Sequence, residues 1–134
     1  MQHSDGRFKG HYGLDLYYRF WIPRGRPKAI LLVVHGFAEH CGRYGNLVDY
    51  FLARGYGIYT FDLRGHGRSD GVRGYTDRLS DIVTDVEIFR ELVRSRHHDV
   101  PLFLLGHSAG GTIAAAIPSP IKTAFTGWYS AEHC

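Results

Sequence analysis

Three short apolar segments alternate along the chain with two segments of helical spacing. The apolar segments are AILLVVHG (residues 29–36), YGIYTFDLRG (56–65) and LFLLG (102–106). In the first and third, apolar residues occupy consecutive positions instead of every second one. That pattern is typical of strands buried on both faces, as in a parallel sheet with helices above and below it.

The two segments between these strands carry apolar residues at helical spacing. In residues 43–55 the spaced positions are Leu47, Tyr50, Phe51 and Arg54. Gly55 is the predicted stop of this helix. In residues 80–98 one face carries Ile82, Val86, Phe89 and Val93. Ser80 is the predicted N-cap of the second helix.

The aromatic-rich segment near the N-terminus, residues 7–23, is interrupted by Gly-Leu-Asp. It predicts one or two antiparallel strands joined by a turn. Strands that alternate with helices further along the chain predict an α/β fold. We therefore expect a mostly parallel sheet with flanking helices and antiparallel strands at the N-terminal side.

Composition narrows the class of protein. With 134 residues, of which 44% are hydrophobic and 14% aromatic, the chain is long enough for one globular domain and too apolar for a disordered one. The net charge is +3. The sixteen Lys and Arg residues are spread along the chain, so no nucleic-acid partner is predicted.

The small number of cysteines and the absence of an apolar signal segment favour a cytoplasmic location. Cys41 and Cys134 are too few for a disulfide framework, which fits a reducing compartment. The first ten residues, MQHSDGRFKG, lack the apolar region of a signal peptide. No apolar run approaches the roughly 18 residues of a membrane-spanning helix.

The candidate chemistry lies in GHSAG, residues 106–110, which matches the G-x-S-x-G pattern. A serine hydroxyl is a weak nucleophile and must stand clear of the backbone to meet a base and a substrate carbonyl. A tight turn from strand to helix achieves this, and glycines at both ends of the motif remove the Cβ atoms that would collide. The motif predicts Ser108 as a nucleophile.

An acyl-transfer site also needs two N–H donors for the developing oxyanion. The residue after the serine, Ala109, supplies one. The sequence VVHGFAEH ends a neighbouring strand, and Gly36 allows a backbone turn that aims the N–H of Phe37 inward. We interpret His35 as a structural histidine and not as a base.

Three motifs in this order resemble a known family. HGFAEHCGRY (35–44), FDLRGHGRSDG (61–71) and GHSAGG (106–111) are similar to the monoacylglycerol lipase and lysophospholipase branch of the α/β-hydrolases, often grouped with serine aminopeptidases. The likeness covers roughly residues 8–116. It implies an α/β-hydrolase fold, Ser108 as nucleophile, and the backbone N–H groups of Phe37 and Ala109 as oxyanion donors.

The resemblance also implies a substrate class and partners. It points to a serine hydrolase of the lipase or esterase type that acts on acyl glycerol or lysophospholipid-like esters, without cofactor or metal. A lipid ester substrate is compatible with membrane contact, and no oligomeric state follows from these residues. In the family, the DLRGHGRS loop is structural, so Asp62, Arg64 and His66 take no catalytic role.

The other members of a catalytic triad are missing from the expected places. In this fold the acid and then the histidine follow the serine along the chain. After Ser108 come only one glutamate, Glu132, and one histidine, His133, which are adjacent. We therefore expect the 134-residue chain itself to be inactive, with a non-catalytic fragment or pseudoenzyme as the alternative function.

The resemblance fades after residue 116, where Pro118 and Pro120 stop the helix. We expect residues 1–117 to be the N-terminal part of a truncated α/β-hydrolase domain and residues 118–134 to be an atypical tail. The strand before Ser108 is then expected to keep an unpaired edge, which would favour aggregation.

Three other patterns suggest different sites but match them poorly. Residues 65–71 form G-x-G-x-x-x-G, one residue too long for a dinucleotide loop, with Asp70 at the place of the third glycine. The set His35, His40 and Cys41 has no common zinc spacing and no second cluster. His97 and His98 end a helix, where a cationic side chain suits the helix dipole.

Overall fold

The structure of the chain, a computed structural model, describes residues 1–34, 43–74, 78–107, 113 and 122–126. Within these ranges it contains one six-stranded sheet in the order β1-β2-β4-β3-β5-β6. The strands are β1 (Gln2–Lys9), β2 (Asp15–Ile22), β3 (Ile30–Val34), β4 (Gly57–Phe61), β5 (Leu102–His107) and β6 (Lys122–Thr126). The helices are η1 (His11–Gly13), α1 (Arg43–Ala53) and α2 (Leu79–Arg96). The predicted α/β class is confirmed.

The sheet is parallel in its centre and antiparallel at the N-terminal edge. β4, β3, β5 and β6 pair in parallel, whereas β2 pairs antiparallel with both β1 and β4. The predicted antiparallel strands near the N-terminus are therefore present as the β1–β2 hairpin. Its turn is η1, where Tyr12 adopts a left-handed conformation at φ 60°.

β5 is not an edge strand, so the expected unpaired edge next to Ser108 is wrong. Residues 103–107 pair in parallel with β6, from Phe103 opposite Lys122 to His107 opposite Thr126. The backbone groups of β5 thus find partners on both sides, in β3 and in β6. Whether residues 118–134 are an atypical tail stays a prediction.

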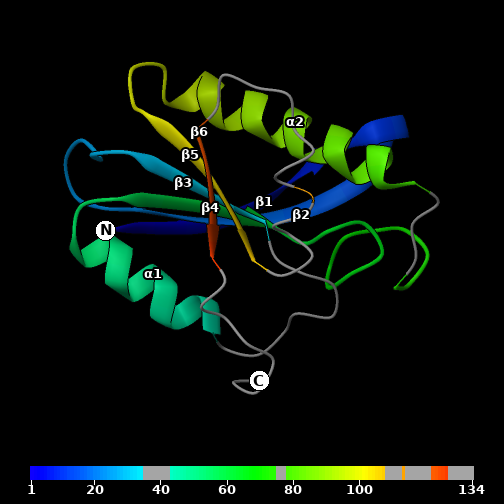
Figure 1. The fold of residues 1–134 in the computed structure, drawn as a ribbon, viewed down its shortest axis with the longest axis horizontal. Helices are drawn as coiled ribbons and strands as arrows, with labels where there is room; N and C mark the ends of the chain where they lie inside the picture. The colour runs from blue at the N-terminus through cyan, green and yellow to red at the C-terminus, as the bar shows by residue number, and fades with distance from the viewer. Residues whose placement is uncertain (35–42, 75–77, 108–112, 114–121, 127–134) are drawn as a thin grey trace.

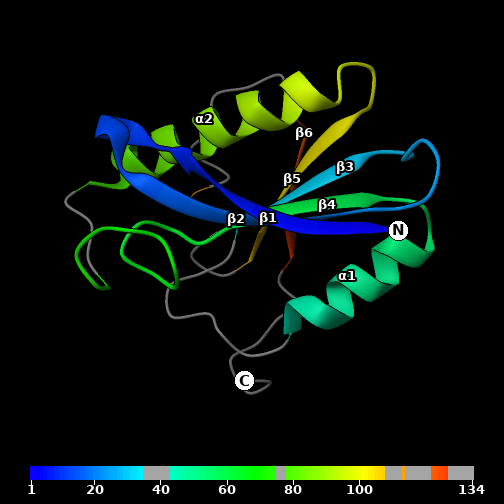
Figure 2. The ribbon, with the colours of Figure 1, turned by 180° about the vertical axis from the view of Figure 1, so that it is seen from behind.

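Among the described residues, α2 covers one face of the sheet and α1 covers the other. Figure 1 shows α2 above the strands and α1 below them, and Figure 2 shows the same arrangement from behind. Alternation along β3 explains its continuous apolar run, because Ile30, Leu32 and Val34 join the larger core cluster with residues of α2. Leu31 and Val33 join the smaller cluster with residues of α1.

The buried face of α1 agrees with the predicted spacing only in part, because Leu47 and Phe51 face the core and Tyr50 does not. Leu47 and Val48 are buried in the core, whereas Tyr50 is exposed and carries the Arg54 guanidinium 3.6 Å from its ring centroid. α1 ends where predicted, because Gly55 adopts φ 90° and its N–H donates to Leu52 O at 3.1 Å.

The buried stripe of α2 is as predicted, but its start is not. The four predicted residues Ile82, Val86, Phe89 and Val93 are all buried. The N-cap is Arg78, with an extended backbone, and not Ser80. Ser80 lies inside the first turn, where its carbonyl accepts the Thr84 hydroxyl at 2.9 Å.

Candidate functional site

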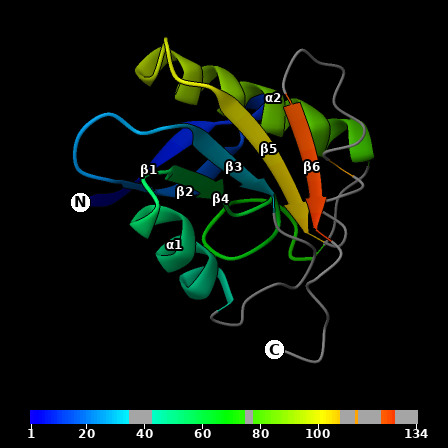
Figure 3. The ribbon, with the colours of Figure 1, turned by 60° about the vertical axis from the view of Figure 1, so that its left-hand side comes forward.

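The candidate site lies beyond the carboxyl ends of the parallel strands. Figure 3 shows the arrowheads of β3, β4, β5 and β6 directed toward the same side of the molecule. In the register of the β3–β5 pair, Val34 lies opposite Gly106. In open α/β sheets, ligands bind in the crevice outside this edge.

The three residues predicted for catalysis fall outside the described part of the chain. These are Ser108, Phe37 and Ala109. The structure does describe the strands that lead to them, since β3 ends at Val34 and β5 ends at His107. The strand predicted before the serine is therefore confirmed.

One described residue after the serine is also informative. Ile113 is helical and only 1% exposed, and it belongs to the core cluster on the α2 face of the sheet. A strand before the motif and a buried helical residue after it agree with the strand–turn–helix context that G-x-S-x-G requires. Five other residues named from the sequence lie outside the described residues: His35, His40, Cys41, Glu132 and His133.

The loop after β4, residues 62–74, is held by its own polar groups. The Asp62 carboxylate accepts the Arg68 N–H at 3.0 Å, and the Ser69 hydroxyl donates to Asp62 O at 2.5 Å. The Ser69 oxygen in turn accepts the N–H of Tyr17 in β2 at 2.9 Å. These contacts fix the loop to the hairpin and agree with the structural role that the resemblance implied.

The same loop offers little to a nucleotide. Several backbone N–H groups of the loop donate to carbonyl or carboxylate oxygens of the protein. They include those of Gly65, His66, Arg68, Ser69 and Asp70. Phosphate binding by a glycine-rich loop depends on N–H groups that point at the ligand. The alternative of a dinucleotide loop at residues 65–71 therefore gains no support.

A buried ion pair joins this loop to α2. The Asp85 side chain is fully buried and accepts Arg64 Nε at 2.7 Å and Arg64 Nη2 at 2.8 Å. It also accepts the backbone N–H of His11 at 2.8 Å. The hydrogen bonds to Asp85 raise the pKa of Arg64 above its usual value.

Sequence reasoning missed Asp85, although a signal for it existed. The residue lies three positions after Ile82 and one before Val86, inside the apolar stripe of α2. An aspartate on the buried face of a helix requires a cationic or N–H partner. The partner, Arg64, is 21 positions away, so spacing alone does not identify it.

Neither a metal site nor a membrane-spanning helix is found among the described residues. Within them, no group of three or more His, Cys, Asp or Glu side chains is arranged to hold a metal ion. Among the helices that the structure describes, none is both long and apolar enough to cross a membrane.

His97, directly after α2, lies in surroundings that disfavour its charged form, contrary to the sequence interpretation. Burial lowers the pKa of His97, and the nearby Arg96 and Arg94 guanidinium groups lower it further. Its Nε2 lies 3.0 Å from the hydroxyl oxygen of Tyr59. A neutral imidazole can accept that hydroxyl proton, whereas a protonated imidazole can only donate to the hydroxyl oxygen.

We predict that His97 makes the protein less stable in mild acid. Because the pKa of His97 is lower in the folded state than its usual 6.5, the unfolded chain takes up the proton first as pH falls. The free energy of unfolding should therefore decrease below about pH 6.5. Urea unfolding at a series of pH values should give a shallower decrease for His97→Gln than for the unsubstituted chain, and equal slopes would contradict the prediction.

Comparison with known proteins places the chain in a family. A family model described as serine aminopeptidase, S33, matches residues 25–128. The monoglyceride lipase of Mus musculus is 38% identical over 115 residues, which are 86% of this chain and 38% of that protein. The monoacylglycerol lipase of Mycolicibacterium smegmatis is 38% identical over 113 residues, 84% of this chain and 40% of that protein.

Solved structures agree with this assignment. A thermostable carboxyl esterase from Bacillus coagulans, in complex with glycerol, matches with a TM-score of 0.75 and 28% identity over 85% of this chain and 39% of its own. A monoglyceride lipase from Saccharomyces cerevisiae, in complex with a substrate analog, matches with a TM-score of 0.73 and 30% identity over 85% of this chain and 38% of its own.

The chain spans about 40% of the length of the curated relatives described above. The match nevertheless includes most of its own residues and all three motifs that carry the resemblance. The chain therefore belongs to the serine aminopeptidase S33 family of α/β-hydrolases, in which monoglyceride lipases are among its relatives.

Proposed function

We propose that the protein is a serine ester hydrolase of the lipase or esterase type, with Ser108 as its nucleophile. The observation that carries the proposal is the register of β3 and β5. Val34 at the end of β3 lies opposite Gly106 in β5. Along the sequence, Phe37 comes three residues after Val34, and Ser108 comes two residues after Gly106. Nucleophile and oxyanion loop thus start from neighbouring strand ends.

The chemistry follows from these roles. The Ser108 oxygen forms a bond to the acyl carbon of an ester, and the electron pair of the carbonyl bond moves to its oxygen. The N–H groups of Phe37 and Ala109 stabilise that negative charge. Collapse of the intermediate breaks the bond to the leaving alcohol, which takes up the proton that a base has removed from the serine.

The substrate class rests on the relatives. The mouse and mycobacterial relatives are monoacylglycerol lipases, and the yeast structure holds a substrate analog. We extend to this chain a small-molecule acyl ester, of the acyl glycerol or lysophospholipid type. No cofactor is part of the proposed reaction, and a cytoplasmic location stays a prediction.

A second candidate, a non-catalytic protein, is favoured by one feature of the sequence. After Ser108 the 134 residues contain only Glu132 and His133 as acid and histidine, and these are neighbours. Loss of the base from a comparable serine hydrolase lowers kcat by about 10⁶-fold. For a polypeptide of these 134 residues alone, we therefore expect little turnover.

A fluorophosphonate probe distinguishes the two candidates, because it reacts with an activated serine without needing the right substrate. The 134-residue chain, its Ser108→Ala variant and the mouse monoglyceride lipase are treated in parallel, and adducts are located by peptide mass spectrometry. An adduct at Ser108 supports the hydrolase. No adduct on the chain, while the mouse enzyme is labelled, supports the non-catalytic alternative for a polypeptide of these 134 residues.

A further inference from the structure

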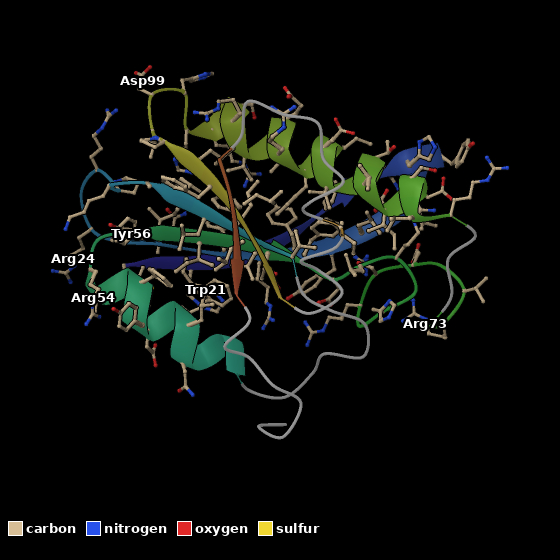
Figure 4. The ribbon with its side chains drawn as sticks, viewed as in Figure 1. Trp21, Arg24, Arg54, Tyr56, Arg73 and Asp99 are labelled. Carbon is tan, nitrogen blue, oxygen red and sulfur yellow. The ribbon has the colours of Figure 1, made fainter. Side chains whose placement is uncertain are left out.

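A cavity open to solvent lies on the face of the sheet that α2 covers. Its volume is about 470 Å³ between β1, β2, β4 and the last turn of α2, and its lining includes Ser4, Tyr18, Phe20, Tyr59, Arg96 and His97. The last turn of α2 leads to the start of β5, so the cavity is near the amino ends of the parallel strands. Figure 4 shows this end through Arg24, Arg54 and Asp99, with Arg73 of the 62–74 loop at the opposite end.

The wall of the cavity is a stack of aromatic rings. Phe20 and Tyr59 stack at a centroid distance of 5.0 Å and an interplanar angle of 12°, and Tyr18 lies 6.2 Å from Phe20. All three side chains are held in the core and cannot turn away. Gly6 of β1 makes room for the Tyr18 ring, since a Cβ there would lie 2.8 Å from the phenol oxygen.

A guanidinium group lies over this aromatic wall. The Cζ atom of Arg96 is 5.4 Å from the Tyr18 ring centroid and 5.7 Å from that of Phe20. Its Nη2 donates to the Tyr18 hydroxyl at 2.8 Å. The guanidinium also hydrogen-bonds the Tyr59 hydroxyl. Two phenol hydroxyls thus hold Arg96, and the rest of its five N–H donors remain for a ligand.

Arg96 has no carboxylate partner among the described residues, unlike Arg64 with Asp85. The acidic residue that also borders the cavity, Asp5, accepts the hydroxyl of Tyr17 at 2.7 Å. Alternation along β2 directs Tyr17 and Tyr18 to opposite faces of the sheet, so this carboxylate is engaged on the face away from Arg96.

We propose that the cavity binds a small organic anion with a flat apolar body, such as an aromatic carboxylate. The carboxylate would accept hydrogen bonds from the remaining N–H groups of Arg96, and the ring would pack against Ile22 and the exposed edge of Phe20. The Ser4 side chain offers a hydroxyl at the rim of the cavity. This site is separate from the proposed hydrolase site. A negative benzoate result would therefore not contradict the proposed hydrolase, and a negative probe result would not contradict this site.

Benzoate is the probe, with benzamide as its uncharged counterpart and acetate as an anion without a ring. Binding to the 134-residue chain is followed by NMR through the His97 imidazole resonances, which lie beside Arg96. Benzoate is expected to give saturable shifts. Benzamide and acetate should each bind on the order of tenfold more weakly, because each lacks one of the two interactions.

Variants test the role of the cation. Arg96→Met should weaken benzoate binding on the order of tenfold or more. Arg54→Met, which removes a guanidinium on the exposed side of α1, should leave it unchanged. If Arg96→Met fails to fold, the comparison of benzoate with benzamide and acetate on the unsubstituted chain still decides the question.

Three results would overturn the proposal. The first is the absence of any His97 shift up to about 10 mM benzoate, a concentration at which millimolar affinity is detected. The second is binding of benzamide or acetate as tight as that of benzoate. The third is an unchanged benzoate affinity in a folded Arg96→Met variant.

Discussion

Replacing Asp85 by alanine should lower the free energy of unfolding by about 3–5 kcal/mol, because it leaves the Arg64 guanidinium without its counter-charge. The Arg64 side chain is only 12% exposed, so water replaces the lost carboxylate poorly. The substitution also removes the acceptor of the His11 N–H. Urea unfolding followed by far-ultraviolet circular dichroism measures the loss.

The same helix supplies a matched control for the ion pair. Glu91 pairs with Arg90 at 3.2 Å, but its side chain is 68% exposed. Glu91→Gln should therefore cost no more than about 0.5 kcal/mol. A double variant, Arg64→Met with Asp85→Leu, should be more stable than Asp85→Ala because no buried charge is left unpaired. Similar losses for Asp85→Ala and Glu91→Gln would contradict the argument.

Replacing Phe89 by alanine should destabilise the protein by about 3–5 kcal/mol, the range for removal of a buried aromatic ring. Phe89 is 2% exposed, and its ring centroid lies 4.9 Å from that of Phe61 and 5.1 Å from that of Phe8. The variant would open a cavity between α2 and the sheet. Since domains are stable by only about 5–15 kcal/mol, the loss is a large fraction of the total.

Two further variants of α2 test whether the effect depends on burial. Phe89→Leu keeps part of the side-chain volume and should cost less than Phe89→Ala. Leu79→Ala removes a side chain of a residue that is 44% exposed and should change stability by about 0.5 kcal/mol or less. An equal loss for Leu79→Ala and Phe89→Ala would show that packing against the sheet is not the cause.

Two arginines of this fold, Arg64 and Arg96, lie in different environments. Arg64 is committed to Asp85, and together they tie the loop after β4 to α2. Arg96 is held by aromatic rings and a phenol hydroxyl. The first arrangement stabilises the end of the sheet next to the candidate hydrolase site. The second leaves a cation that can bind a ligand.

Patterns confined to one element predicted that element well. The apolar run of residues 29–36 predicts β3, and the spacing of Ile82, Val86, Phe89 and Val93 predicts the buried face of α2. The apolar run of residues 102–106 likewise predicts β5, the strand before Ser108. Less certain signals failed, since Ser80 is a good capping residue in isolation but the chain enters the helix at Arg78.

The sequence by itself determined most of the strands and helices and the buried faces of β3 and α2, because side-chain periodicity within an element encodes its burial. Only the tertiary structure decided which distant residues meet. The pairing of β6 with β5, the bond between Arg64 and Asp85 and the position of Arg96 over Tyr18 all join residues at least 19 positions apart. Such contacts depend on how the sheet stacks its strands and helices, which no local spacing specifies.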